Sequence, residues 1–155
     1  MSLTAPQVKD FLNKWIGAYG SNSKDFFEAF APDASIFTLS SPARVDGREN
    51  FRDAFDPNFT GDRRGQILSP DIQIYGDLAV ISCHSRISLD KKVTHLRTSL
   101  CVRAGEGGKL QITHMHQSPM GVPGSAAPPA AGGADGIQLL EERVAVAAAA
   151  VGTPK

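Results

Sequence analysis

Apolar residues recur at helical spacing near the start of the chain. They follow "TAPQ", which has the pattern of a capping box. The spaced positions are Val8, Phe11, Leu12, Trp15, Ile16 and Tyr19. Because this spacing places them on one side of a helix, it predicts a long amphipathic helix.

Two shorter helices are predicted after the first. The stretch "SNSKDFFEAFAPDA" predicts a helix that is capped by Ser21 or Ser23 and ends at Pro32. The pattern Asp46-x-x-Glu49 predicts the cap of a third helix. These three helices all lie in the N-terminal half of the chain.

Strand-like alternation dominates the rest of the first 120 residues. The strand "ASIFTL" precedes the third helix, and four further strands follow it: "GQILSPDIQIY", "DLAVISCHSRIS", "VTHLRTSLCVR" and "KLQITHMHQS". Short turns join these four, which predicts an antiparallel meander. The predicted fold class is α+β, with a curved antiparallel sheet wrapped by the three helices.

The composition changes after the last predicted strand. We expect one domain over residues 1–120 and a Pro/Gly/Ala-rich linker over 121–136. A possible helix over 137–151 places Ile137, Leu140, Val144 and Ala148 on one face. It either docks on a protein surface or is a passive tail, and the sequence leaves both open.

Composition excludes several classes of partner. Sixteen basic residues balance sixteen acidic ones among 155, without a Lys/Arg block, so we expect no binding to nucleic acid. The sequence has neither a signal peptide pattern nor a membrane span, and we expect a cytoplasmic protein without a membrane partner. Cys83 and Cys101 lie in neighbouring predicted strands on opposite faces, so they are expected to be reduced.

Four nitrogen-rich side chains fall on one face of two neighbouring strands. Pairing Ser88 with Val93 across the "LDKK" turn places Arg86 opposite His95 and His84 opposite Arg97. Such like-charged neighbours are expected either on an exposed, solvated face or around a bound anion, because Arg is suited to hold carboxylates.

The order of elements resembles the SnoaL-like and nuclear transport factor 2-like superfamily. The likeness is strongest to the association (hub) domain of calcium/calmodulin-dependent protein kinase II and its bacterial relatives. It rests on "SPDIQIYGDLAVISCHSRI", on "RVDGRENFRDAF" and on "GGKLQITHMHQS", and it covers residues 5 to 119. The chain departs from the family in having Leu110 where Trp is usual and Gln117 where the hub domain has a pocket arginine.

The resemblance implies a cone-shaped sheet with a pocket on its concave side and an association surface on its convex side. In relatives the first helix covers the pocket mouth, so Trp15 and Tyr19 become candidate ligand-binding residues beside Arg86, Arg97 and Gln117. We therefore expect a small organic anion as partner, and a homodimer.

Two histidines, His114 and His116, stand in the last predicted strand. If the "AGEGG" loop pairs Arg103 with Lys109, Gln111, Thr113, Met115 and Gln117 share the face of Arg86 and Arg97. The two histidines then lie on the opposite face. They supply only two of the three or four ligands that zinc needs, so no metal site is expected.

Two functions remain open from the sequence. One is a small-molecule pocket protein, either without catalysis or acting as a cofactor-free isomerase, hydratase or cyclase in which His84 or His95 moves a proton. The other is an oligomerisation module without catalysis, whose apolar sheet face is covered by association.

Overall fold

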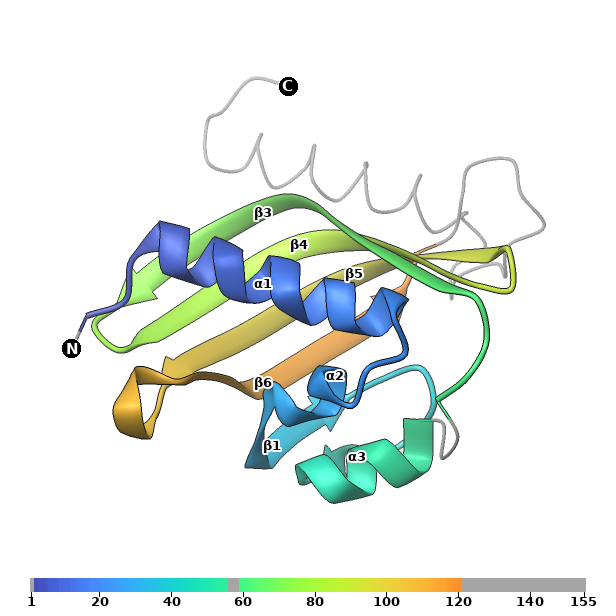
Figure 1. The fold of residues 1–155 in the computed structure, drawn as a ribbon, viewed down its shortest axis with the longest axis horizontal. Coiled ribbons are helices and arrows are strands. Elements are labelled where there is room, and N and C mark those ends of the chain that lie inside the picture. The colour runs from blue at the N-terminus through green and yellow to red at the C-terminus, as the bar shows by residue number, and fades with distance from the viewer. Residues whose placement is uncertain (1, 56–58, 121–155) are drawn as a thin grey trace, which may run out of the picture. The chain divides into compact units, whose positions relative to one another are not determined.

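The computed structural model describes residues 2–55 and 59–120. Within these residues, six strands form one sheet in the order β2-β1-β6-β5-β4-β3 (Figure 1). The residues up to Pro119 form one compact unit. The linker and helix that the sequence predicts over 121–136 and 137–151 lie outside the described residues.

Four long strands make up most of the sheet. They are β3 (Arg63–Tyr75), β4 (Leu78–Leu89), β5 (Lys92–Ala104) and β6 (Leu110–Pro119). Each pairs antiparallel with the next, which confirms the predicted meander. A single turn of 3-10 helix, η1 (Glu106–Gly108), connects β5 to β6.

The sheet is mixed rather than wholly antiparallel. Strand β1 (Phe30–Phe37) runs parallel to β6, and the two-residue β2 (Val45–Asp46) pairs antiparallel with β1. A hairpin would force neighbouring strands to be antiparallel, whereas β1 and β6 are separated by the whole meander. The curved α+β fold with three helices is confirmed.

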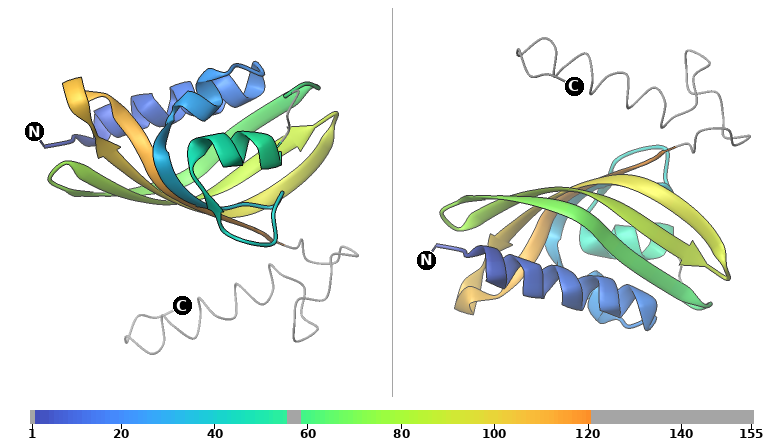
Figure 2. Two further views of the ribbon diagram at one scale, coloured as in Figure 1. Left: turned by 90° about the horizontal axis from the view of Figure 1, so that it is seen from below. Right: turned by 90° about the horizontal axis from the view of Figure 1, so that it is seen from above.

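Helix α1 (Ala5–Gly20) begins at the capping box predicted from the sequence. The Gln7 amide N–H donates to Thr4 Oγ1 at 3.3 Å, and the Thr4 amide N–H donates to Gln7 Oε1 at 2.9 Å. The buried residues of α1 are Val8, Leu12, Trp15 and Tyr19. This face packs across the sheet, on the same side as the other two helices (Figure 2).

The second helix is shorter than predicted. Helix α2 (Asp25–Glu28) has four residues, and β1 begins two residues later at Phe30. Pro32 therefore lies inside a strand and does not end a helix. Its missing N–H leaves no gap in the ladder to β2, because β2 pairs only with Ser35 and Ile36.

The third helix, α3 (Arg48–Phe55), begins two residues after Asp46. Asp46 belongs to β2, and its carboxylate accepts from Arg44 Nε at 2.7 Å. The predicted capping role of Asp46 was wrong, because that neighbouring cation takes its carboxylate.

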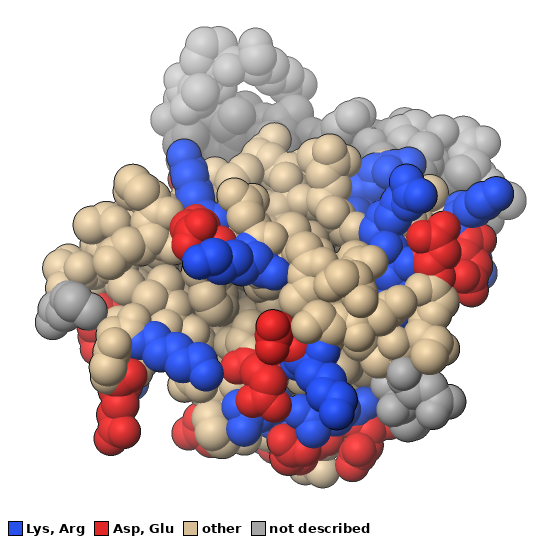
Figure 3. All heavy atoms as spheres, viewed as in Figure 1, with Lys and Arg blue, Asp and Glu red and all other residues tan. Residues whose placement is uncertain are grey.

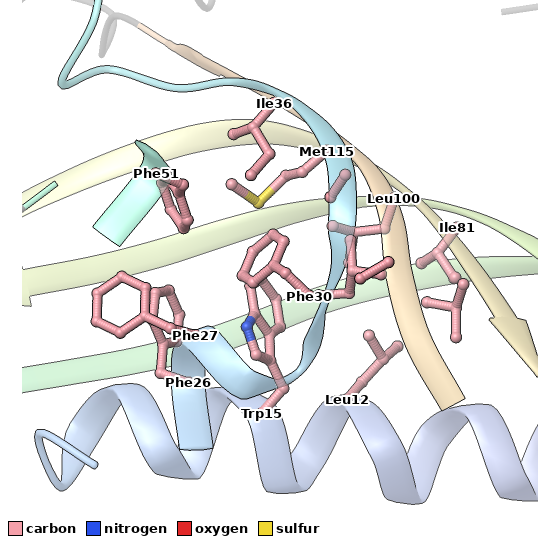
Figure 4. Packing of buried hydrophobic residues seen from close by; sticks show 14 of the residues in the cluster. Leu12, Trp15, Phe26, Phe27, Phe30, Ile36, Phe51, Ile81, Leu100 and Met115 are labelled. Carbon is pink, nitrogen blue, oxygen red and sulfur yellow. The ribbon is translucent and has the colours of Figure 1, made fainter. Parts of the chain in front are cut away.

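Aromatic rings fill the space between the helices and the sheet (Figure 4). Trp15 stacks on Phe26 with ring centroids 5.5 Å apart, and Phe30 contacts Phe51 at 4.9 Å. The rings in mutual contact are Trp15, Tyr19, Phe26, Phe27, Phe30, Phe51, Phe55 and Phe59. This region of the interior is therefore a packed core.

Candidate functional site

The two faces of the sheet differ in their surroundings. Ile81, Leu100 and Met115 point toward the helices and are at most 1% exposed (Figure 4). We call this the covered face. The opposite face, on which none of the described helices packs, is called the outer face (Figure 2).

The predicted pairing of β4 with β5 is confirmed. Ser88 pairs with Val93, Arg86 with His95, and His84 with Arg97. These last four side chains alternate with residues of the covered face, so they lie on the outer face. His84, Arg86 and Arg97 are exposed and His95 is half-buried. The structure thus separates them from Trp15 and Tyr19, which lie on the other side of the sheet.

The last strand, β6, contains a one-residue bulge, and the side chains beyond it lie on the opposite face from the one predicted. Arg103 pairs with Gln111 and not with Lys109, and this two-residue slip alone would keep each side chain on its expected face. After Ile112 the register shifts, leaving Thr113 as the extra residue. The residues beyond it therefore change face.

As a consequence, His114 and His116 lie on the outer face together with Arg97, and Gln117 lies on the covered face. The expectation that Gln117 shares a face with the two arginines was wrong. Gln117 pairs with Thr98, whose hydroxyl is 3.1 Å from that of Ser85. Neutral polar groups thus occupy this part of the covered face.

A cavity of about 290 Å³ opens where the end of α1 approaches the β4–β5 turn. We call it the mouth cavity. It is lined by Tyr19, Phe55, Arg63, Ile87, Ser88, Leu89, Lys92 and Thr94. Of the predicted ligand-binding residues, only Tyr19 lines it.

Arg63 is the most buried charged residue of the mouth cavity, with 5% of its surface exposed. Its guanidinium carbon lies 5.5 Å from the ring centroid of Tyr19, 5.3 Å from that of Phe55 and 4.8 Å from that of Phe59. A guanidinium at these distances is attracted to the negative faces of the rings. Aromatic rings thus contribute to the position of this cation.

Arg63 was not predicted as a site residue, because the strand predicted from the sequence begins at Gly65. Strand β3 in fact begins at Arg63, in phase with Gly65 and Ile67, which lie on the covered face opposite Ile87 and Ser85. Extending the alternation two residues backwards would have found it. Lys92 was likewise assigned to a turn but starts β5.

Both cysteines are free thiols on opposite faces of the sheet, as predicted. Burial raises the pKa of Cys83, and a hydrogen bond with Ser85 lowers it in part. Burial also raises the pKa of Cys101. A raised pKa disfavours the thiolate, so neither thiol is an activated nucleophile.

Charges on the helix side are mixed in sign. Acidic and basic side chains gather together over α2 and α3 in the lower part of the view (Figure 3). Arg52 bridges Glu28 and Glu49 there at 3.1 and 3.0 Å. In residues 2–55 and 59–120, no three His, Cys, Asp or Glu side chains gather as metal ligands would.

These features define an α+β domain with a covered sheet face, an outer face and a small cavity at one end. Residues 8–123 match the model of the SnoaL-like domain, and the chain belongs to this family. The resemblance inferred from the sequence is confirmed. No curated protein matches the chain. Among the described helices, none is long and apolar enough to cross a membrane.

Solved structures share the fold. A protein from Xanthomonas campestris, assigned as a calcium/calmodulin-dependent protein kinase II association domain, has a TM-score of 0.67 and 22% identity over 76% of this chain and 89% of its own. The calcium/calmodulin-dependent protein kinase II hub of S. rosetta has a TM-score of 0.62 and 18% identity, over 77% of this chain and 98% of its own. A nuclear transport factor 2-like protein of unknown function from Pseudomonas putida has a TM-score of 0.65 and 16% identity, over 78% of this chain and 88% of its own. At these identities the likeness concerns the fold alone.

Proposed function

We propose that the chain binds a small organic anion in the mouth cavity. The observation that carries this proposal is the buried guanidinium of Arg63, held among aromatic rings on the wall of a cavity that also contains Lys92. Charged donors make strong hydrogen bonds to carboxylates, and the apolar lining favours a ligand with a hydrophobic body. A small carboxylate with an aromatic or aliphatic body fits both features.

We assign binding rather than catalysis to this cavity. Its described lining contains no histidine, aspartate or glutamate, which are the usual side chains for proton transfer. His84 and His95, the predicted catalytic residues, lie on the outer face. A proton-transfer role for them stays a prediction that requires a substrate bound at that face.

The test is a thermal-shift screen of small carboxylates, each beside its neutral amide. We expect a carboxylate at about a hundredfold its Kd to stabilise the protein by about 2.7 kcal/mol, and the amide to have little effect. Lys92→Gln should weaken binding about tenfold to a hundredfold, because it removes a charged hydrogen-bond donor.

Lys91→Gln is the matched control, since Lys91 is adjacent, exposed and outside the cavity lining. The variants Arg86→Gln and Arg97→Gln, tested in the same thermal-shift screen, show whether the anion binds at the outer face instead. A response lost in these two variants and kept in Lys92→Gln would place the anion on the outer face, where the sequence-based choice of Arg86 and Arg97 would hold. A wild type that no carboxylate stabilises would refute the proposal altogether.

A second candidate function is self-association through the outer face, with a homodimer as the smallest assembly. That face carries large apolar side chains that are strongly exposed, namely Phe37 at 41%, Tyr75 at 61% and Val93 at 40%. Similar structures that are described as association or hub domains support it. Free cysteines are consistent with the predicted cytoplasmic location. The measurement is the mass in solution by light scattering, and a single-chain mass at micromolar concentration would exclude it.

A further inference from the structure

All four histidines of the chain lie on the outer face of the sheet. His84 and His95 come from β4 and β5, and His114 and His116 come from β6 beyond the bulge. None of them lines the mouth cavity. Histidine is the side-chain type used most often as a proton-dependent switch near neutral pH, and every histidine of this chain therefore lies on one surface.

The groups that face these imidazoles are neutral or positive. His84 pairs with Arg97 and His95 with Arg86, so two cations stand directly beside two histidines. His114 Nδ1 lies 2.8 Å from Ser35 Oγ and its ring is 6.3 Å from that of Phe37. The ring of His116 is 5.3 Å from that of Phe37.

Acidic groups on this face are few. In the part of the chain that the structure describes, no histidine makes an ion pair. Three acidic residues near the face are paired with arginines, in the pairs Asp62 with Arg64, Asp77 with Arg103, and Asp46 with Arg44. Two acidic residues of this face have no ion pair among the described residues: Asp71, opposite Ser82, accepts from the Gln73 amide, and Asp33 lies beside Arg103 and Gln111.

A second copy of this chain fits the resulting charge pattern. Asp71 pairs with Ser82 of β4, and Arg86 lies four positions further along the same strand. At the usual rise of a strand, Asp71 and Arg86 are therefore separated by about 13 Å along the strand direction. A two-fold axis between these positions sets the Asp71 of each copy near the arginines of the other. An interface of this kind must be self-complementary, and this face carries both charges together with exposed apolar side chains.

We infer that the outer face holds two copies together at neutral pH and releases them when its histidines are protonated. The inference rests on the self-association proposed above. With neutral imidazoles, the described part of each outer face has two arginines outside ion pairs, Arg86 and Arg97, and two carboxylates outside them, Asp33 and Asp71. Protonation adds up to four positive charges to the outer face of each copy, two of them directly beside Arg86 and Arg97, and like charges brought together at an interface oppose binding.

The experiment measures the mass of the full chain by light scattering at about pH 7.5 and about pH 5.5, at constant ionic strength, with circular dichroism to confirm folding. We expect two chains at the higher pH and a dissociation constant on the order of a hundredfold larger at the lower pH. Replacing all four histidines by glutamine should keep the dimer at both pH values. Should that variant fail to fold, His84→Gln with His116→Gln, both at exposed positions, should lower the pH of dissociation.

The outcomes separate the two proposals. A single chain at both pH values overturns the association and with it the inference. A dimer that persists at about pH 5.5 overturns only the pH dependence. Dissociation that is unchanged in the histidine variants but lost in Asp71→Asn also overturns it, because a carboxylate would then carry the effect.

Discussion

The alkylation rates of the Cys83 and Cys101 thiols test which face of the sheet is exposed to solvent. Burial raises the pKa of both, so we expect slow alkylation at neutral pH and a rate that rises as the pH approaches the pKa, since the thiolate is the nucleophile. In protein diluted below the dissociation constant of the proposed dimer, Cys101, half-buried on the outer face, should react before the buried Cys83. Mass spectrometry of iodoacetamide-treated protein over a pH series measures this, with denatured protein as control. Faster labelling of Cys83 would contradict the assigned faces.

Alternation along β4 and β5 was enough to predict which residues share a face, because the short turn between them fixes the register. It also indicated which face is buried, since Ile81 and Leu100 are apolar. Arg86 and Arg97 were nevertheless expected on the concave side, because the family that the sequence resembles has its pocket there. For His114 the sequence could not suffice, because the bulge at Thr113 depends on pairing with neighbouring strands.

The packing of α1 on β3 depends on Gly65. A Cβ there would lie 2.6 Å from Ile16 Cδ1, which is too short for two carbon atoms, and 3.2 Å from Tyr19 Cδ2, which is a tight contact. We expect Gly65→Ala to cost about 1–3 kcal/mol of unfolding free energy and to displace Tyr19, thereby weakening carboxylate binding in the mouth cavity. Chemical denaturation and the thermal-shift screen measure the two effects.

Gly17→Ala in α1 is the control for this change. A Cβ at Gly17 meets nothing within 4 Å, and alanine favours a helix over glycine by about 0.5–1 kcal/mol, so this variant should be more stable than the wild type. Equal destabilisation by both substitutions would show that α1 does not pack closely on β3.

Long elements were predicted better than short ones. The capping box and the apolar stripe identified α1, because sixteen residues carry several independent signals. The four-residue α2 carried too few, and its end was misplaced at Pro32. The parallel pairing of β1 with β6 is a long-range contact that no local pattern encodes. The mouth cavity is likewise lined by residues of α1, α3, β3, β4 and β5, which are far apart in the sequence, and this is why most of its lining was not predicted.

The two proposed functions occupy opposite faces of the domain and should respond separately to mutation. Phe37 on the outer face and Leu89 in the mouth cavity are 41% and 40% exposed, so replacing either by serine removes a similar apolar surface. Phe37→Ser should raise the dissociation constant of the dimer at least about tenfold and leave stabilisation by carboxylates unchanged. Leu89→Ser should weaken carboxylate binding about tenfold and leave the mass in solution unchanged. Light scattering and thermal shift on both variants complete the test. If either substitution altered both readouts to the same extent, binding and association would share one surface, and the assignment of separate faces would be wrong.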